Sequence, residues 1–146
     1  MKPSCEYLAK IGELAYLVSR LEWQIIDDIR LATTTIDAID LHGLPTGAIG
    51  RALEATVPDL SSRPNVQHFV ATSVRALLDV AARRNMVLHA RPGRTRSGDE
   101  RLLKLRAGKA GDVEGVWIDE DYLDKQIAAV EYWLRRVQQA RELPPD

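Results

Sequence analysis

Apolar residues recur every three or four positions along most of this chain, and this period constrains the fold more than any other feature of the sequence. Side chains with that spacing lie on one face of a helix and must be buried against other elements. The longest series predicts a helix from about Tyr7 to Ile39. The run Thr33-Thr34-Thr35 within it is a poor helical sequence and can mark a bend. The stripe consists of Leu8, Ile11, Ala15, Val18, Ile25, Ile29, Ala32 and Ile36.

Three further helices are expected. A short helix covers about Thr46 to Val57, because residues 42–45 (His-Gly-Leu-Pro) end the first helix. A longer one runs from Asn65, its expected N-cap, to about Ala90, where Pro92-Gly93 ends it. The last begins at residues 119–121, since acidic residues are favourable at a helix N-terminus. Pro144-Pro145 follows this last helix.

A β-hairpin is predicted before the last helix. Its two arms flank the turn at residues 107–111, and residues 94–99 before it form a polar, flexible loop. The apolar residues of the arms are Leu102, Leu103, Leu105, Val113, Val116, Trp117 and Ile118. The expected fold class is therefore all-α. We expect one domain over residues 1–146, a small antiparallel bundle of four to five helices with a β-hairpin insertion near 101–118.

The composition excludes several classes of protein. No run of about 18 apolar residues is present, so no membrane partner is expected, and residues 1–6 lack the apolar run of a signal peptide. The single cysteine, Cys5, cannot form an internal disulfide, which favours a cytoplasmic protein. His42, His68 and His89 lie in different elements, and no glycine-rich phosphate loop occurs. Neither a metal site nor a cofactor is therefore expected.

Basic residues gather in one part of the chain, although the net charge is only −1. Residues 75–109 contain ten lysines and arginines against three acidic residues, a balance of +7. A locally positive surface attracts polyanions such as RNA whatever the total charge. The alternative is a solvated basic loop that faces the acidic first and last helices.

Two charged residues interrupt the apolar stripes. Glu22 occupies a stripe position of the first helix, and Arg84 occupies one of the third. A buried charge is costly unless it is paired. We therefore expect the two helices to pack together with Glu22 near Arg84, where the carboxylate would orient the guanidinium. The alternative is that both long side chains reach solvent from the edges of their stripes.

The segment from Arg84 to His89 combines a phosphate-binding group with a proton-transfer group near the end of the third helix. Arginine presents a planar fork of donors that suits phosphate, and histidine can move a proton near neutral pH. Arg63 and His68 have the same spacing, but they span a predicted loop-to-helix junction. On a regular helix Arg84 and His89 are about 140° apart. They converge only if the helix end is irregular, which Pro92 favours, or if a second subunit supplies the other half.

The segment RNMVLH, at residues 84–89 late in a long helix, resembles the Arg-x4-6-His motif of HEPN domains. The resemblance covers roughly residues 5–92 and the last helix. It implies a metal-independent endoribonuclease of the toxin or defence type that acts as a homodimer, with an antitoxin or regulatory protein as a possible partner. His89 would be the general base or acid, Arg84 would stabilise the transition state, and Asn85 would orient the phosphate or the imidazole. Glu22 would support them.

One residue departs from the family pattern. Toxin members that pair with a nucleotidyltransferase antitoxin carry a tyrosine two residues after the histidine, where this chain has Arg91, so control by modification is not expected. The expected RNA contacts are Arg83, Arg91, Arg94, Arg96 and Arg101. Many HEPN domains are inactive binding modules. A non-catalytic dimer that binds RNA, nucleotide or a protein partner is therefore the alternative, and a helix-end network that binds nothing is a third interpretation.

Four large aromatic residues could in principle stack on nucleic-acid bases. They are Trp23, Trp117, Tyr132 and Trp133. Because large aromatic side chains dominate the burial in cores and interfaces, we expect these four there rather than at a base-stacking site.

Overall fold

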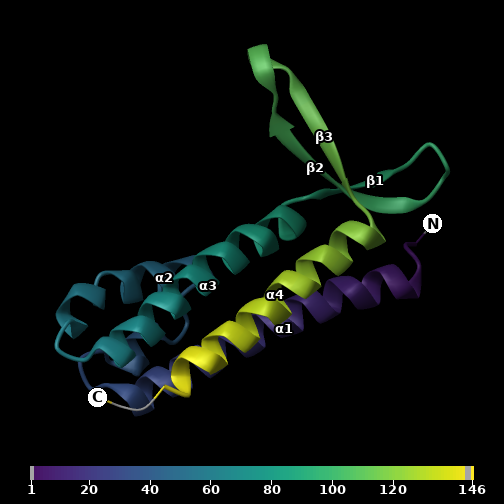
Figure 1. Ribbon diagram of the computed structural model, residues 1–146. Helices are drawn as coiled ribbons and strands as arrows, with labels where there is room; N and C mark the ends of the chain where they lie inside the picture. Colours follow the sequence, from purple (N-terminus) through teal and green to yellow (C-terminus); the bar gives the residue numbers. More distant parts are fainter. Residues whose placement is uncertain (1, 144–145) are drawn as a thin grey trace.

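The computed structural model describes residues 2–143 and residue 146. Four helices make up most of it: α1 (Cys5–Ala32), α2 (Thr46–Glu54), α3 (Pro64–Leu88) and α4 (Glu120–Arg141). Three strands, β1 (Arg91–Arg94), β2 (Glu100–Ala107) and β3 (Val113–Ile118), lie between α3 and α4 in the chain. Short 3-10 turns occur at η1 (Ala38–Leu41), η2 (Val57–Leu60) and η3 (Lys109–Gly111). Figure 1 shows the helices lying alongside one another and the sheet at one end.

The expectation of an all-α fold is wrong, because the chain forms an α+β fold. Its three strands make an antiparallel sheet in the order β1-β2-β3. The hairpin β2–β3 is present, with Leu102 opposite Ile118 and Ala107 opposite Val113. Strand β1 was not expected: it occupies residues at which a helix end and a flexible loop were predicted. Pro92 keeps the chain extended after α3, and the extended segment pairs with β2.

The loop expected at residues 94–99 includes the end of β1 and an ordered turn. Its Thr95 N–H donates to the Asp99 carbonyl at 3.0 Å. The Ser97 hydroxyl lies 2.8 Å from that of Thr95 and donates to the Asp99 carboxylate at 2.9 Å. These local side-chain bonds close the turn between β1 and β2.

Helix boundaries also differ from those expected, and α2 ends at Glu54 rather than near Val57. Helix α1 ends at Ala32 rather than near Ile39, because Thr33 is extended and its hydroxyl accepts a hydrogen bond from the Thr35 N–H. Helix α3 begins at Pro64 with Arg63 as its N-cap, so Asn65 is not the cap. A proline at the first helical position loses no hydrogen bond. Pro144 and Pro145 lie outside the described residues.

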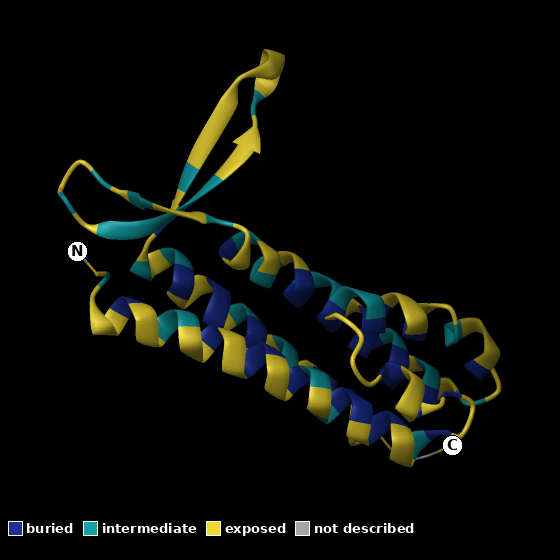
Figure 2. Cartoon of the chain, turned by 180° about the vertical axis from the view of Figure 1, so that it is seen from behind, coloured by how far each residue is buried: buried dark blue, intermediate teal, exposed yellow. Residues whose placement is uncertain are grey.

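The core lies where α1 and α3 pack against α4, and α2 covers part of α3. Figure 2 shows the buried positions on the inner faces of the helices. Leu21, Ile25 and Ile29 of α1 are fully buried, whereas Leu8 of the predicted stripe is 48% exposed. Each fully buried leucine or isoleucine contributes about 1.5–3 kcal/mol relative to exposure. The helices therefore carry most of the buried apolar residues, and the sheet is attached to this helical body.

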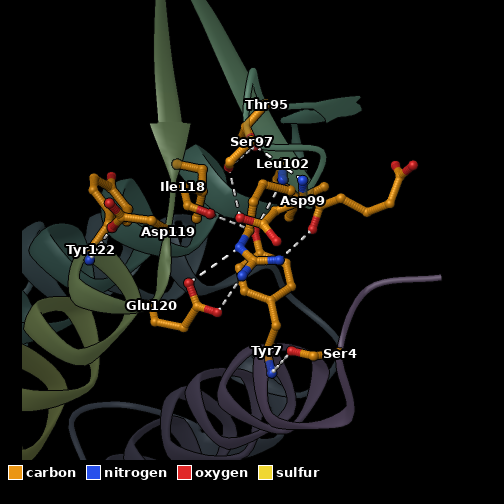
Figure 3. A network of polar contacts seen from close by, with 12 residues as sticks. Ser4, Tyr7, Thr95, Ser97, Asp99, Leu102, Ile118, Asp119, Glu120 and Tyr122 are labelled. Carbon is orange, nitrogen blue, oxygen red and sulfur yellow. Dashed lines mark hydrogen bonds and ion pairs between the residues drawn. The ribbon is translucent and has the colours of Figure 1, made fainter. Parts of the chain in front are cut away.

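One tyrosine fixes the base of the sheet to the helices (Figure 3). The Tyr7 hydroxyl donates to the Ile118 carbonyl at 2.5 Å and accepts from the Leu102 N–H at 3.0 Å. The Arg101 guanidinium lies 4.6 Å from the Tyr7 ring and binds Glu120 of α4 at 2.6 Å. The far half of the hairpin stands away from the helices, as Figure 1 shows. Within the described residues, the hairpin is thus anchored to the helices at its base.

Across residues 2–143, no helix is both long enough and apolar enough to span a bilayer.

Candidate functional site

A charged cluster joins the first three helices. The Thr46 hydroxyl, at the first residue of α2, donates to the Glu22 carboxylate of α1. The same carboxylate oxygen lies 3.9 Å from Nη1 of Arg84 on α3. The expected approach of Glu22 to Arg84 is therefore present. Thr46, which is fully buried, was not expected to take part and gives Glu22 its direct hydrogen bond.

Arg84 is partly buried and only loosely paired. Its ion pair with Glu22 is near the outer limit of such contacts, and its Nε is buried without a hydrogen-bond partner in the described part of the chain. A short bond from the guanidinium to a carboxylate would consume much of its capacity to bind phosphate. The wide spacing instead leaves donor groups of Arg84 available at the surface, while Glu22 restrains the direction of the side chain.

Arg84, Asn85 and His89 line one surface pocket of about 470 Å³ between α2 and α3. His89 is the C-cap of α3, with φ −97° and ψ 9°, and its N–H donates to the Asn85 carbonyl at 3.1 Å. The imidazole is exposed. His89 thus departs from helical geometry at the end of α3, and Arg84 and His89 line the same pocket within a single chain.

The second Arg-x4-His copy has no such arrangement. Arg63 lines a pocket near Asp28 and Arg141, whereas His68 lines a different one with Arg136. The shared pocket therefore distinguishes Arg84 and His89 from a copy with the same spacing.

Arg51 of α2 also lines the pocket and was not predicted. A Cβ added at Gly47 would lie 3.4 Å from Nη1 of Arg51 and 3.6 Å from the Ala81 Cβ. The guanidinium of Arg51 therefore lies across Gly47 beside α3. It makes no ion pair within residues 2–143 or with residue 146. The only signal in the sequence was Gly47, one helical turn before Arg51. That pattern indicates a pocket residue only once the helix opposite Gly47 is known.

Helix α2 lies close to α3 because of a second glycine. A Cβ at Gly50 would be 3.0 Å from Cδ2 of Leu78 and 3.3 Å from the Cβ of Leu77. Contacts under 3.4 Å require the neighbouring atoms to shift. Gly50 therefore permits the separation of the two helices that form the walls of the pocket.

The five arginines predicted to contact RNA do not line this pocket. Arg83 binds Asp79 one turn earlier on α3 at 2.8 Å and reaches Gln126 of α4 at 2.9 Å. Arg94 binds Glu100 at 2.9 Å. The side chain of Arg101 is only 14% exposed and binds Glu120 in the sheet anchor.

Arg91 and Arg96 differ from these three. Both are exposed, and neither has a carboxylate partner among the described residues. Arg91 begins β1, two residues after His89, and Arg96 lies in the turn between β1 and β2. Of the five predicted contacts, these two remain available as unpaired cations.

No protein-family model, curated protein or solved structure matches this chain. The HEPN resemblance therefore stays a prediction from the sequence motif. The groups that line the pocket are two guanidiniums, an amide and an imidazole.

Proposed function

We propose that this protein is a metal-independent endoribonuclease of the HEPN type that acts as a homodimer on RNA. The observation that supports the proposal is one open pocket lined by an imidazole, an amide and two guanidinium groups. Guanidinium groups hold phosphate by paired donors, and an exposed imidazole can exchange protons with a bound substrate. Together these groups have the chemistry that cleavage of a phosphodiester needs.

In this mechanism the ribose 2′-oxygen attacks the neighbouring phosphorus. His89 takes the proton of the 2′-hydroxyl, the bond from phosphorus to the 5′-oxygen breaks, and that oxygen leaves with a proton. The products are a 2′,3′-cyclic phosphate and a free 5′-hydroxyl. Proton transfer by a positioned imidazole contributes about 10²–10⁴-fold to such a rate.

The remaining pocket residues act on the phosphate. Arg84 and Arg51 donate to the non-bridging oxygens, where negative charge increases in the transition state. Asn85 orients the phosphate from the same face of α3 as His89. Each chain supplies one histidine to the pocket, whereas the reaction needs both a base and an acid. A second copy of the chain would supply the other group, which is the chemical reason for proposing a homodimer.

A non-catalytic pocket that holds an RNA phosphate or a nucleotide is the second candidate. The observation that favours it is Glu22, whose carboxylate lies 3.9 Å from Arg84. A fixed negative charge beside Arg84 offsets part of the field that would stabilise a transition state. Such a pocket would bind RNA without cleaving it.

Cleavage of labelled single-stranded RNA in the presence of EDTA tests the proposal. We expect wild-type protein to produce 2′,3′-cyclic phosphate ends and His89→Ala to lose about 10²-fold or more of the rate. His68→Ala is the matched control, because His68 has the same spacing from an arginine but lines another pocket. RNA left intact by wild-type protein would exclude the enzyme, and RNA binding that depends on Arg51 and Arg84 would then favour the second candidate.

A further inference from the structure

Trp23 is a large aromatic residue on the solvent side of α1. It is 49% exposed, although the sequence predicted a core or interface position. It lies two residues from Leu21 and from Ile25, both fully buried, and therefore about 160° from each around the helix. The ring is held by the exposed His42, whose imidazole lies edge-on at 5.1 Å between centroids and 62° between planes. Trp23 and His42 form an ordered aromatic pair at the surface.

Each residue of this aromatic pair is close in the chain to a residue that contacts or lines the pocket. Glu22, the residue before Trp23, lies 3.9 Å from Arg84 and accepts a hydrogen bond from Thr46. His42 precedes Thr46 by four residues, and Pro45 between them lines the pocket. The segment from η1 to α2 is therefore held against Trp23 at one end and against Glu22 at the other. Neither Trp23 nor His42 lines the pocket, and the pair is connected to it through Glu22 and Pro45.

We propose that Trp23 and His42 form a base-stacking subsite for a nucleotide next to the phosphate held by Arg51 and Arg84. This inference rests on the proposed binding of RNA at the pocket. An exposed tryptophan gives a flat, apolar surface on which any base can stack, and each such contact contributes about 1–3 kcal/mol. The phosphate pocket would then position the strand, and the aromatic pair would hold one base clear of its neighbours.

The surroundings of Trp23 favour a base over a protein partner. Its exposed neighbours one turn away on α1 are polar: Ser19, Arg20 and Asp27. On the segment that carries His42, Ile39 and Leu44 are exposed apolar residues. The nearest large exposed aromatic on the same face, Tyr16, is two turns away. Protein interfaces bury a contiguous patch with an apolar centre, whereas a ring flanked by polar residues along α1 suits one stacked base.

Binding of a short fluorescein-labelled single-stranded RNA, measured by anisotropy in a His89→Ala background, tests the subsite. We expect Trp23→Ala to weaken binding by about fivefold to a hundredfold, and Trp23→Phe to weaken it less. Tyr132→Ala is the matched control. Tyr132 is 47% exposed and lies edge-on to Trp133 at 5.3 Å and 69° on α4. Trp23 differs from it in following Glu22, which contacts Arg84 and Thr46. Replacing Tyr132 should change the RNA affinity less than twofold, which is below the smallest loss expected when a stacked base contact is removed.

Three outcomes would overturn the inference. If Trp23→Ala binds as tightly as the Tyr132→Ala control while Arg51→Ala weakens binding, the subsite is excluded and the proposed function stands. If the His89→Ala protein and the wild type bind no RNA, both proposals are excluded. If light scattering shows that Trp23→Ala alters the mass of the particle in solution, the ring lies in a protein interface and not at a base.

Discussion

Two aspartates of the helical body show how the surroundings of a single residue decide the effect of its charge. Asp28 of α1 is 6% exposed, and burial raises the pKa of its carboxyl although Arg141 opposes that shift from 3.1 Å. Its second oxygen is buried without a hydrogen-bond partner among the described residues. Burial also acts to raise the pKa of Asp79, but hydrogen bonds from Arg83 and Trp133 outweigh it, and the pKa is lowered.

Replacing Asp28 by asparagine should stabilise the protein at pH 7. The folded-state pKa of Asp28 lies above its ordinary value of 3.8. The stability linked to the protonated carboxyl is therefore complete below pH 3.8, and it is lost as pH rises through the folded-state pKa. The asparagine side chain cannot ionise and retains that stability. Urea unfolding at pH 7 and near pH 4 should show the gain of Asp28→Asn at pH 7 and its decline toward acid. A variant less stable than wild type at pH 7 would contradict this.

Asp79→Asn is the control of opposite sign. The lowered pKa of Asp79 contributes stability above the ordinary value of 3.8 that is lost as pH falls through the folded pKa. This variant should be less stable than wild type at pH 7, and the deficit should shrink toward acid. A similar pH profile for both variants would show that the two environments do not differ as described.

At the scale of elements, the contact between α2 and α3 is the most sensitive to a small change. Gly50→Val should destabilise the protein by about 1–3 kcal/mol, because added atoms at 3.0–3.3 Å from Leu77 and Leu78 force the helices apart. Gly12→Ala on α1 meets no atom within 4 Å and should stabilise by about 0.5–1 kcal/mol. Urea denaturation of both variants measures the difference. Equal stability of the two variants would mean that the glycine contact does not set the helix separation.

The elements also show what the sequence could predict. Long helices were predicted because their apolar period is local, and Glu22 and Arg84 could be paired because both interrupt apolar stripes. Strand β1 could not be predicted from the sequence. Its four residues, which include Pro92 and Gly93, have little strand tendency and become a strand only by pairing with β2. Arg51 was missed for a related reason: its place in the pocket depends on the packing of α2 against α3.

At the scale of the whole molecule, the basic block is more neutral than its composition indicates. Five of its ten basic residues lie within ion-pair distance of a carboxylate: Arg83, Arg84, Arg94, Arg101 and Arg106. The other five have no such partner among the described residues. The +7 balance of residues 75–109 therefore overstates the positive field available to a polyanion. Binding through the pocket would use mainly Arg51 and Arg84.

A shallow salt dependence of RNA binding follows from this. Each neutralised phosphate of a single strand contributes a slope of about −0.7 to log K against log salt, so two arginine contacts predict about −1.4. Titrations at several potassium chloride concentrations measure the slope, and Arg51→Ala should make it shallower by about 0.7. A slope near −7, as ten contacts would give, would show that the whole basic block binds the strand.

The pairing of the first and last helices has a consequence for how the chain is made. Helices α1 and α4 lie side by side (Figure 1) although more than eighty residues separate the end of one from the start of the other. On the ribosome, the apolar side of α1 emerges before α4 and lacks this cover until residues 120–141 have been translated. Helix α3 can cover part of this stripe earlier, but the packing of α1 is completed only after the last helix has left the ribosome.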